Sequence, residues 1–571
     1  MNIDMLQAEN SLTKQYQCIL DVFGLHQVIE KPTRVTKSSK TLIDHLITNF
    51  PQRIADTGII PCSIVSDHDG IYANINVRVP RFVKLVADHL ACPLTSIINK
   101  CISNAYFQKL WKIARVSPIP KVENPTSNDQ LRTISILPVL SKVFEKLVAG
   151  QMSEFAERAA LLPDRISGFR KGHSTTSVLL GIRDDIRHAM KKGEITLMVL
   201  ADFSKAFDTI CFKSTIEKFY KLGFSKTFLK WWLSYLSGRS QFVQIDDKSS
   251  SRKPIHFGIP QGSILGPLIF NLYVADLNDV ISSHTNCYQY ADDTTLYNHC
   301  KVADLTTGET SMNKTLTKLS NWSQGSNLAL NPTKTKCMLF TTSQMSTYHS
   351  LSSRPLQLAV EGKVLERVKS TKLLGVHLKE NLKWDAHVKH LASTCYGTLA
   401  NLRKIKNFTT FTLRKHLAES LIISRLDFSD IVFYPLTEHL LNRLQRIQYS
   451  AASFVTGRYV NSIESILKLG WLPMRERRDW HILKAAHKAL YSSDWPLYVS
   501  LERSEHTRVL RSNAQVNLVI PLVSNTFQDC SASLLNSLPV DIKSCTDHRG
   551  FSRQTFNILK QRCLTLFNCN A

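Results

Sequence analysis

The sequence predicts an α+β protein, because strand-like and helix-like patterns occupy different stretches of the chain. The apolar residues 197–200 predict a buried strand. Aromatic-rich residues on both sides of 290–293 predict the two strands of a hairpin. Between residues 438 and 457, apolar side chains recur at helical spacing and leave a basic side, which predicts an amphipathic helix. The 43% of hydrophobic residues suffice for sizeable cores between these elements.

Three aspartates follow the strand-like segments. Asp202 comes soon after the apolar run, and Asp292 and Asp293 stand side by side at the expected hairpin tip. Neighbouring carboxylates repel each other, so crowding them costs free energy unless a cation compensates their charge. Hard oxygen ligands on one sheet edge suit a pair of divalent ions about 3.5–4 Å apart. The pattern predicts a metal-dependent nucleotidyl-transfer site, although an isolated Asp-Asp pair is also typical of a plain turn.

A glycine-rich segment lies between these aspartates in the sequence. Gly258, Gly262 and Gly266 permit backbone conformations that other residues avoid, and they allow the chain to approach a ligand closely. A turn that leads into a helix would explain the glycines but not Gln261. We therefore expect this loop to lie against a bound nucleotide or base pair.

These segments, taken in order, resemble motifs A to E of the reverse transcriptase palm. The five matching stretches are residues 202–208, 258–267, 290–293, 328–336 and 373–376. Upstream, three stretches are similar to the finger motifs of reverse transcriptases from non-LTR (LINE-type, jockey-like) retrotransposons: residues 118–121, 131–137 and 168–175.

The resemblance implies a right-hand polymerase fold. Its fingers and palm are expected at 94–380, a helical thumb at 381–460 and a helical C-terminal region at 461–571. The implied activity is that of an RNA-directed DNA polymerase, with an RNA template, a DNA primer or target and deoxynucleoside triphosphates as partners. Target-primed reverse transcription, in which a nicked chromosomal end is the primer, is implied as well.

The resemblance also assigns roles to single residues. Asp202, Asp292 and Asp293 are expected to hold two Mg²⁺ ions, with Mn²⁺ as a possible substitute. Lys334 is the candidate for the general acid that protonates the pyrophosphate leaving group, and Lys336 is the alternative.

Nucleotide contacts are implied at five further positions. They are Lys121 and Arg132 for the triphosphate, Phe207 under the sugar, and Gln261 with Gly262 near the base pair. An aromatic ring at position 207 would collide with a 2′-hydroxyl, which favours deoxynucleotides and argues against an RNA polymerase. The usual Arg-Pro of the family is Arg132-Thr133 here. Asp208 is expected to cap a helix.

Composition agrees with a nucleic-acid partner. The chain has 571 residues and carries 71 Lys and Arg against 46 Asp and Glu, a net charge of +25. Such an excess attracts polyanions. No apolar run reaches the length of a membrane span, no signal-peptide pattern is present, and the 13 cysteines include no Cys-x-x-Cys pair. We expect reduced thiols, no membrane, and a location in the nucleus and cytoplasm.

Residues 1–78 resemble the last third of an apurinic-type endonuclease domain, the DNA-nicking module of the family. Asp44, Asp67 and His68 match its buttressing aspartate, acidic neighbour and catalytic histidine. The earlier metal-binding glutamate of that domain has no counterpart here, so we expect a vestige without nicking activity. A catalytically dead or domesticated nucleic-acid-binding remnant is the alternative to an active polymerase.

Overall fold

The computed structural model describes most of the chain. The described residues are 3–22, 25–35, 39–42, 45, 47–48, 54–60, 70–75, 83, 86–245, 248–504 and 517–568. They form two compact units. The smaller unit comprises Met1–Ile97, Tyr396–Ser420 and Ser453–Arg458, and the larger comprises Ile98–Cys395, Leu421–Ala452 and Tyr459–Ala571.

The smaller unit begins with helix α1 (Ser11–Val22) and continues with short antiparallel strand pairs. The pairs are β1 (His26–Gln27) with β4 (Ile47–Thr48), β2 (Arg34–Val35) with β3 (Lys40–Thr41), and β5 (Ile54–Ile60) with β6 (Gly70–Ile75). Helix α14 (Phe411–Ala418) belongs to this unit as well.

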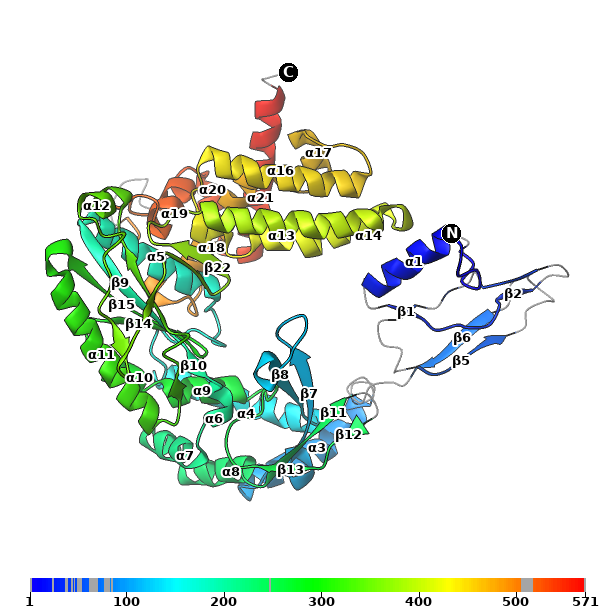
Figure 1. Ribbon diagram of the computed structural model, residues 1–571, viewed down its shortest axis with the longest axis horizontal. Coiled ribbons are helices and arrows are strands. Elements are labelled where there is room, and N and C mark those ends of the chain that lie inside the picture. The colour runs from blue at the N-terminus through cyan, green and yellow to red at the C-terminus, as the bar shows by residue number, and fades with distance from the viewer. Residues whose placement is uncertain are drawn as a thin grey trace. The chain divides into compact units, whose positions relative to one another are not determined.

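The core of the larger unit is a five-stranded sheet (Figure 1). Its strand order is β14 (Asn286–Tyr290), β15 (Asp293–Lys301), β9 (Glu194–Ala201), β17 (Lys336–Phe340) and β20 (Glu366–Arg367). The central strand β9 buries Ile195, Leu197, Met198 and Val199 in succession, as expected for a strand with both faces covered. Helices α5 (Thr175–Lys191) and α11 (Leu305–Gly325) pack on this sheet.

A second sheet forms the region expected to be the fingers. It contains β7 (Ile113–Pro120), β8 (Leu131–Ile136), β11 (Arg239–Ile245), β12 (Lys248–Ser249) and β13 (Lys253–Ile255). Strands β7 and β8 form an antiparallel hairpin, and β11 runs parallel to β7. The helices nearby in sequence are α3 (Ala87–Ser103), α4 (Val139–Arg158), α6 (Ala206–Thr209), α7 (Phe212–Lys221), α8 (Lys226–Leu236), α9 (Gly266–Val274) and α10 (Leu277–Val280).

Small antiparallel pairs and helices follow the five-stranded sheet. They are β10 (Phe203–Ser204) with β16 (Ala329–Leu330), β18 (Ala359–Val360) with β19 (Lys363–Val364), β21 (Ser370–Leu373) with β22 (Val376–Lys379), α12 (Ser343–Tyr348), α13 (Asp385–Lys404), α15 (Ser424–Asp427) and α16 (Glu438–Thr456). The predicted amphipathic helix is confirmed as α16, which buries Leu444, Ile447 and Ala451.

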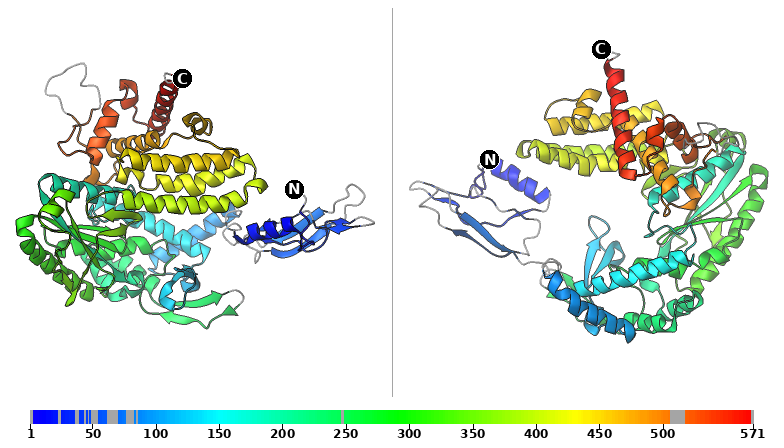
Figure 2. Two further views of the ribbon diagram at one scale, coloured as in Figure 1. Left: turned by 45° about the horizontal axis from the view of Figure 1, so that its top comes forward. Right: turned by 180° about the vertical axis from the view of Figure 1, so that it is seen from behind.

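The C-terminal region is helical, as expected (Figures 1 and 2). Its helices are α17 (Ile463–Lys468), α18 (Met474–Tyr491), α19 (Phe527–Asn536), α20 (Val540–Lys543) and α21 (His548–Asn568). They share a core that includes Leu483, Leu535 and Phe551. Among the helices that the structure describes, none is both long and apolar enough to cross a bilayer.

Candidate active site

The three predicted carboxylates meet at one end of the five-stranded sheet. Strand β9 ends at Ala201, which is paired with Thr294 of β15, so Asp202 follows directly beside the start of β15. The tip of the β14–β15 hairpin is Ala291 and Asp292, where Ala291 has a left-handed φ of 55°. We call residues 290–293 the carboxylate hairpin. The strand, the hairpin and the places of the aspartates are as the sequence predicts.

The charges of these carboxylates act on one another. Burial, together with the neighbouring carboxylates of Asp292 and Asp202, raises the pKa of Asp293 to about 6. Burial and Asp292 also raise the pKa of Asp202, whereas the ammonium group of Lys334 opposes that shift. Neighbouring carboxylates hinder one another's ionisation, and a nearby cation stabilises their charged forms. The donor set thus suits hard divalent ions, which Asp202, Asp292 and Asp293 would hold.

Lys334 is tied to Asp202 through the backbone. The Asn331 amide donates to the Asp202 carbonyl at 2.8 Å, and the Asn331 side-chain oxygen accepts from the Lys334 amide at 3.2 Å. The fully buried Thr335 hydroxyl accepts from the Asp202 amide at 3.3 Å. These bonds keep the loop that carries Lys334 against the end of β9.

Lys336, the alternative general acid, has a different environment. It lies in β17 opposite Leu200 of β9, and its Nζ is 3.5 Å from a carboxylate oxygen of Glu366. Lys334, in contrast, acts on the ionisation of Asp202. The choice of Lys334 over Lys336 as the general acid stays a prediction.

Phe207 packs on the helix that follows the glycine-rich loop. Its ring stacks on Phe270 of α9, with centroids 4.4 Å apart and an interplanar angle of 21°. Its carbonyl accepts from the Ile259 amide at 2.9 Å. The half-buried ring is thereby held against α9, which suits a side chain that limits the space beside a bound sugar.

The glycine-rich residues 258–266, here called the glycine loop, lie against strand β8. A Cβ on Gly262, whose φ is 129°, would approach the Ser135 carbonyl oxygen to 2.2 Å. The Ser135 amide donates to the Gln261 carbonyl at 2.7 Å. At position 262 only glycine satisfies both the backbone angle and the space.

Gln261 has a partner that the sequence did not indicate. Its side-chain amide donates to Asp208 at 3.0 Å. The expectation that Asp208 caps a helix is wrong, because it lies inside α6 and its carboxylate accepts from Gln261. This contact orients the exposed end of Gln261.

A buried carboxylate that the sequence did not indicate accepts hydrogen bonds from the glycine loop. Glu145 of α4 is fully buried. It accepts from the Ser263 hydroxyl at 2.9 Å and from the Ile264 amide at 2.7 Å, and the Tyr235 and Ser141 hydroxyls each lie 3.2 Å from its other oxygen. A buried carboxylate requires such donors to offset its lost hydration. No local sequence pattern points to Glu145, since Tyr235, Ser263 and Ile264 lie 90 or more positions away and only Ser141 is a neighbour in the sequence.

The carboxylate hairpin is backed by Gly168. A Cβ at this position would lie 2.4 Å from the Ala291 amide nitrogen. The buried Asn271 side chain of α9 donates to the Gly168 carbonyl at 2.6 Å. The backbone of residue 168 therefore contacts the turn that carries Asp292. Gly168 belongs to a stretch that the sequence singles out, but its packing role is visible only in the fold.

Lys121 and Arg132 lie on the β7–β8 hairpin. Arg132 is paired with Ile119 across the hairpin, and the Lys121 amide donates to Gln130. Both residues are exposed. Their assignment to the triphosphate stays a prediction.

Three other predicted residues, Asp44, Asp67 and His68, lie outside the described residues.

One further group of possible metal ligands occurs in the described part of the chain. Asp427, Asp430 and His481 bring ligand atoms within 4.8 Å of one another. Arg477 binds both carboxylate oxygens of Asp427 at 2.5 and 2.6 Å, and His481 Nδ1 lies 2.7 Å from Asp430. These contacts already use the carboxylates, so the group is explained by internal ion pairing. The ligand atoms of Asp202, Asp292 and Asp293 do not all lie within 4.8 Å of one another.

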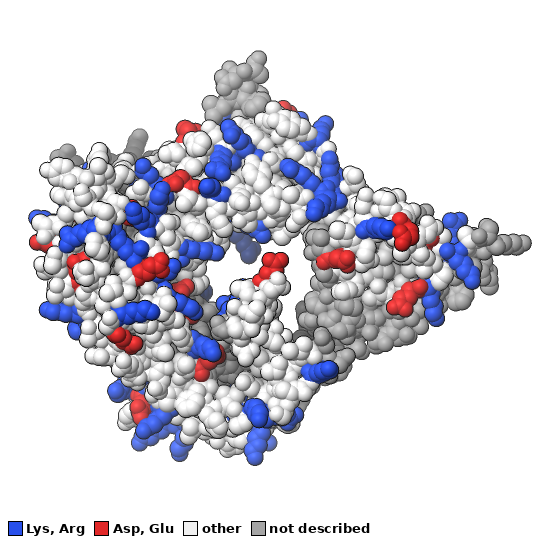
Figure 3. Space-filling view, in the orientation of Figure 1, with Lys and Arg blue, Asp and Glu red and all other residues white. Residues whose placement is uncertain are grey.

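The surface carries the excess of basic residues that the composition predicts. Figure 3 shows Lys and Arg side chains spread over the viewed face, with fewer Asp and Glu among them. Such a surface attracts the phosphates of nucleic acids.

Comparison with known proteins places the site in a family. Residues 119–378 match the family described as "Reverse transcriptase (RNA-dependent DNA polymerase)". The "Probable RNA-directed DNA polymerase from transposon BS" of Drosophila melanogaster is 32% identical over 332 residues, which cover 56% of this chain and 35% of that protein. The "RNA-directed DNA polymerase from mobile element jockey" of the same species is 24% identical over 388 residues, which cover 66% of this chain and 41% of that protein.

The chain spans less than half the length of these curated relatives. Among solved structures, "Structure of apo telomerase from Candida Tropicalis" aligns with 79% of this chain and 77% of that chain at 11% identity and a TM-score of 0.37. The identification therefore depends on the sequence matches. The five-stranded sheet and its carboxylates lie within residues 119–378, the part of the chain that matches the reverse transcriptase family.

Proposed function

We propose that this chain is the RNA-directed DNA polymerase of a non-LTR retrotransposon. The observation that carries the proposal is the group of three mutually repelling carboxylates at the end of β9 and the tip of the carboxylate hairpin. The names of the relatives support the same activity and the same kind of element. The template is RNA, the product is DNA, and a nicked chromosomal end is the proposed primer.

In this proposal Asp202, Asp292 and Asp293 hold two Mg²⁺ ions, for which Mn²⁺ can substitute. Bound ions of this kind activate the primer 3′-hydroxyl and offset the charge of the triphosphate. Lys334, which lies close enough to Asp202 to oppose the rise in its pKa, gives a proton to the departing pyrophosphate.

Other residues bind and select the nucleotide. Arg132 and Lys121 contact the triphosphate from the β7–β8 hairpin. Phe207, stacked on Phe270, excludes a 2′-hydroxyl. Gln261 and Gly262 lie in the glycine loop, which Gly262 allows to pack closely on β8, and this loop lies against the new base pair.

Primer extension tests the proposal. The purified chain is incubated with poly(rA), oligo(dT), dTTP and Mg²⁺, and Asp292→Asn serves as the inactive control. We expect extension by the wild type, no measurable extension by Asp292→Asn, and template binding within about twofold in both, because binding depends on the dispersed basic surface. A wild type that binds the template but never extends the primer would indicate a nucleic-acid-binding remnant.

For residues 1–78 we propose a vestigial endonuclease segment that does not nick DNA. Supercoiled plasmid is incubated with the intact chain and Mg²⁺, and relaxed circles are measured over time. Nicking that disappears in His68→Ala would overturn this proposal and restore a second active site.

A further inference from the structure

The C-terminal region contacts the loop that precedes helix α5. We call residues 494–499 the C-terminal segment. The Asp164 carboxylate accepts from the amides of Leu497 and Tyr498 at 3.4 and 3.1 Å, and Lys171 Nζ lies 2.8 Å from an oxygen of Asp494. Residues more than 300 positions apart in the chain are thus hydrogen bonded to one another.

Tyr498 of this segment contacts the loop before α5, helix α5 and strand β14. Its hydroxyl lies 2.9 Å from the Ser167 hydroxyl and 3.2 Å from the Ser177 hydroxyl. Its ring meets Tyr288 of β14 edge to face at 5.1 Å. A Cβ on Gly181 of α5 would approach Tyr498 Cδ2 to 2.8 Å, so the ring lies directly on that helix.

Ser167 connects Tyr498 to the carboxylate hairpin. Ser167 is fully buried, and its amide donates to the Gln289 carbonyl of β14 at 2.9 Å. The next residue, Gly168, is the one whose Cβ would collide with the Ala291 amide at 2.4 Å. A continuous series of contacts therefore leads from the Tyr498 hydroxyl through Ser167 and Gly168 to the residue before Asp292.

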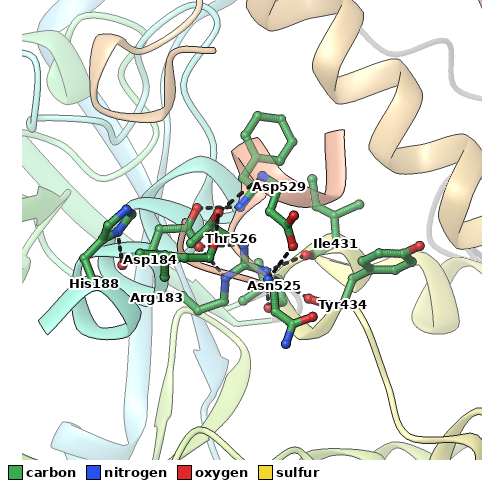
Figure 4. Close-up of polar contacts among 11 residues, drawn as sticks. Arg183, Asp184, His188, Ile431, Tyr434, Asn525, Thr526 and Asp529 are labelled. Carbon is green, nitrogen blue, oxygen red and sulfur yellow. Dashed lines mark hydrogen bonds and ion pairs between the residues drawn. The ribbon is translucent and has the colours of Figure 1, made fainter. Parts of the chain in front are cut away.

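The C-terminal region is attached to α5 at a second point, shown in Figure 4. The Phe527 amide at the start of α19 donates to Asp184 at 2.7 Å, and Arg183 Nε donates to the other oxygen of the same carboxylate at 2.7 Å. Arg183 also donates to the carbonyls of Ile431 and Val432 at 3.0 and 2.9 Å. Two independent attachments fix the C-terminal region on this helix.

Burial raises the pKa of the Tyr498 hydroxyl. The group therefore keeps its proton at neutral pH and can donate a hydrogen bond within the cluster.

We propose that Tyr498 is a positioning residue for the catalytic carboxylates, and that the C-terminal segment is a working part of the polymerase site. By holding Ser167, its hydroxyl keeps Gly168 against Ala291 and so fixes the turn that presents Asp292 and Asp293. This inference rests on the proposed function, in which those carboxylates bind the metal ions.

Tyr498→Phe tests the proposal, with Tyr434→Phe as the matched control. The Tyr434 hydroxyl donates to Asp479 at 2.7 Å, so each variant removes one hydrogen-bonded, partly buried hydroxyl of the larger unit. The single-turnover rate of dTTP incorporation is measured against Mg²⁺ concentration, together with the affinity for dTTP and thermal unfolding. We expect Tyr498→Phe to raise the half-saturating Mg²⁺ concentration about three- to tenfold at unchanged dTTP affinity. Tyr434→Phe should alter only thermal unfolding.

Hydrogen–deuterium exchange of residues 286–297 gives a readout that does not require activity. We expect faster exchange at the hairpin tip in Tyr498→Phe than in Tyr434→Phe, by about threefold or more. Equal Mg²⁺ dependence or equal exchange in the two variants would overturn the proposal. If the wild type does not extend primers, the proposed function fails, and the exchange experiment still decides the role of Tyr498.

Discussion

The carboxylate hairpin and the glycine loop both lie in the region that matches the reverse transcriptase family, but they are held in place by different means. The hairpin is a turn between two paired strands, and Gly168 supports it by close backbone packing against Ala291. The loop accepts one backbone hydrogen bond from Ser135 of β8, and the buried carboxylate of Glu145 accepts hydrogen bonds from Ser263 and Ile264 of the loop. Backbone packing thus positions the hairpin that carries the carboxylates. Hydrogen bonds to a buried carboxylate help to position the loop that is expected to contact the nucleotide.

This difference predicts separate failures. Changes behind the hairpin should lower the rate of the chemical step, because they move metal ligands. Changes beneath the loop should weaken nucleotide binding, because they release a surface that the nucleotide contacts.

The largest effect is expected for the carboxylates themselves. Asp202→Asn should reduce primer extension by at least about a hundredfold, because an amide neither neutralises nor binds a divalent ion as a carboxylate does. RNA binding, measured by filter retention, should stay close to that of the wild type. Asp541→Asn, at an exposed position in α20, is the matched control and should extend normally. Substantial extension by Asp202→Asn would remove this residue from the proposed metal site.

The next largest effect is expected behind the hairpin. In Gly168→Ala the added methyl group would lie 2.4 Å from the Ala291 amide, so the hairpin must shift. Because the hairpin carries Asp292 and Asp293, moving it should lower the maximal incorporation rate by about tenfold or more. Gly150→Ala in α4 is the matched control, since a Cβ there meets nothing within 4 Å. Equal rates for the two variants would show that the packing contact does not position the carboxylates.

A smaller effect is expected beneath the glycine loop. Glu145→Gln removes the negative charge and one of the two accepting oxygens, so the hydrogen bonds from Ser263 and from the Ile264 amide are no longer strengthened by charge. We expect the dissociation constant of the incoming nucleotide to rise about three- to tenfold. Glu464→Gln, in an exposed pair with Lys468, should change nothing measurable. Unaltered nucleotide affinity in Glu145→Gln would separate the loop from nucleotide binding.

The smallest effect on DNA synthesis is expected at the sugar. Phe207→Val should keep dCTP incorporation within about threefold, because neither the carboxylates nor the loop contacts change. Preference for dCTP over rCTP should fall by about tenfold or more, since the ring stacked on Phe270 no longer fills the space. Phe411→Val, at an exposed ring of α14, is the control. Unchanged discrimination in Phe207→Val would contradict the steric role.

Much of the site could be predicted from the sequence because its signals are local. An apolar run followed by Asp202, and a turn that carries Asp292 and Asp293 between aromatic strands, indicate β9 and the β14–β15 hairpin directly. The helical spacing of apolar residues likewise indicates α16.

The supports of the site could not be predicted, because each joins residues far apart in the chain. Glu145 accepts from residues about 120 positions away, and Tyr498 reaches Ser167 across 331 positions. A single sequence records neither pair, since burial and partner choice arise only when the elements pack. Asp208 shows the same limit, because its local pattern suggests a cap whereas its carboxylate accepts from Gln261.

The most direct test of the contrast between hairpin and loop is one single-turnover titration with dTTP on poly(rA) and oligo(dT). Wild type, Gly168→Ala and Glu145→Gln are compared for maximal rate and for nucleotide dissociation constant. We predict that Gly168→Ala lowers the maximal rate at an unchanged dissociation constant, and that Glu145→Gln mainly raises the dissociation constant. If both variants change the two quantities in the same proportion, the hairpin and the loop do not have separate roles, and the account is contradicted.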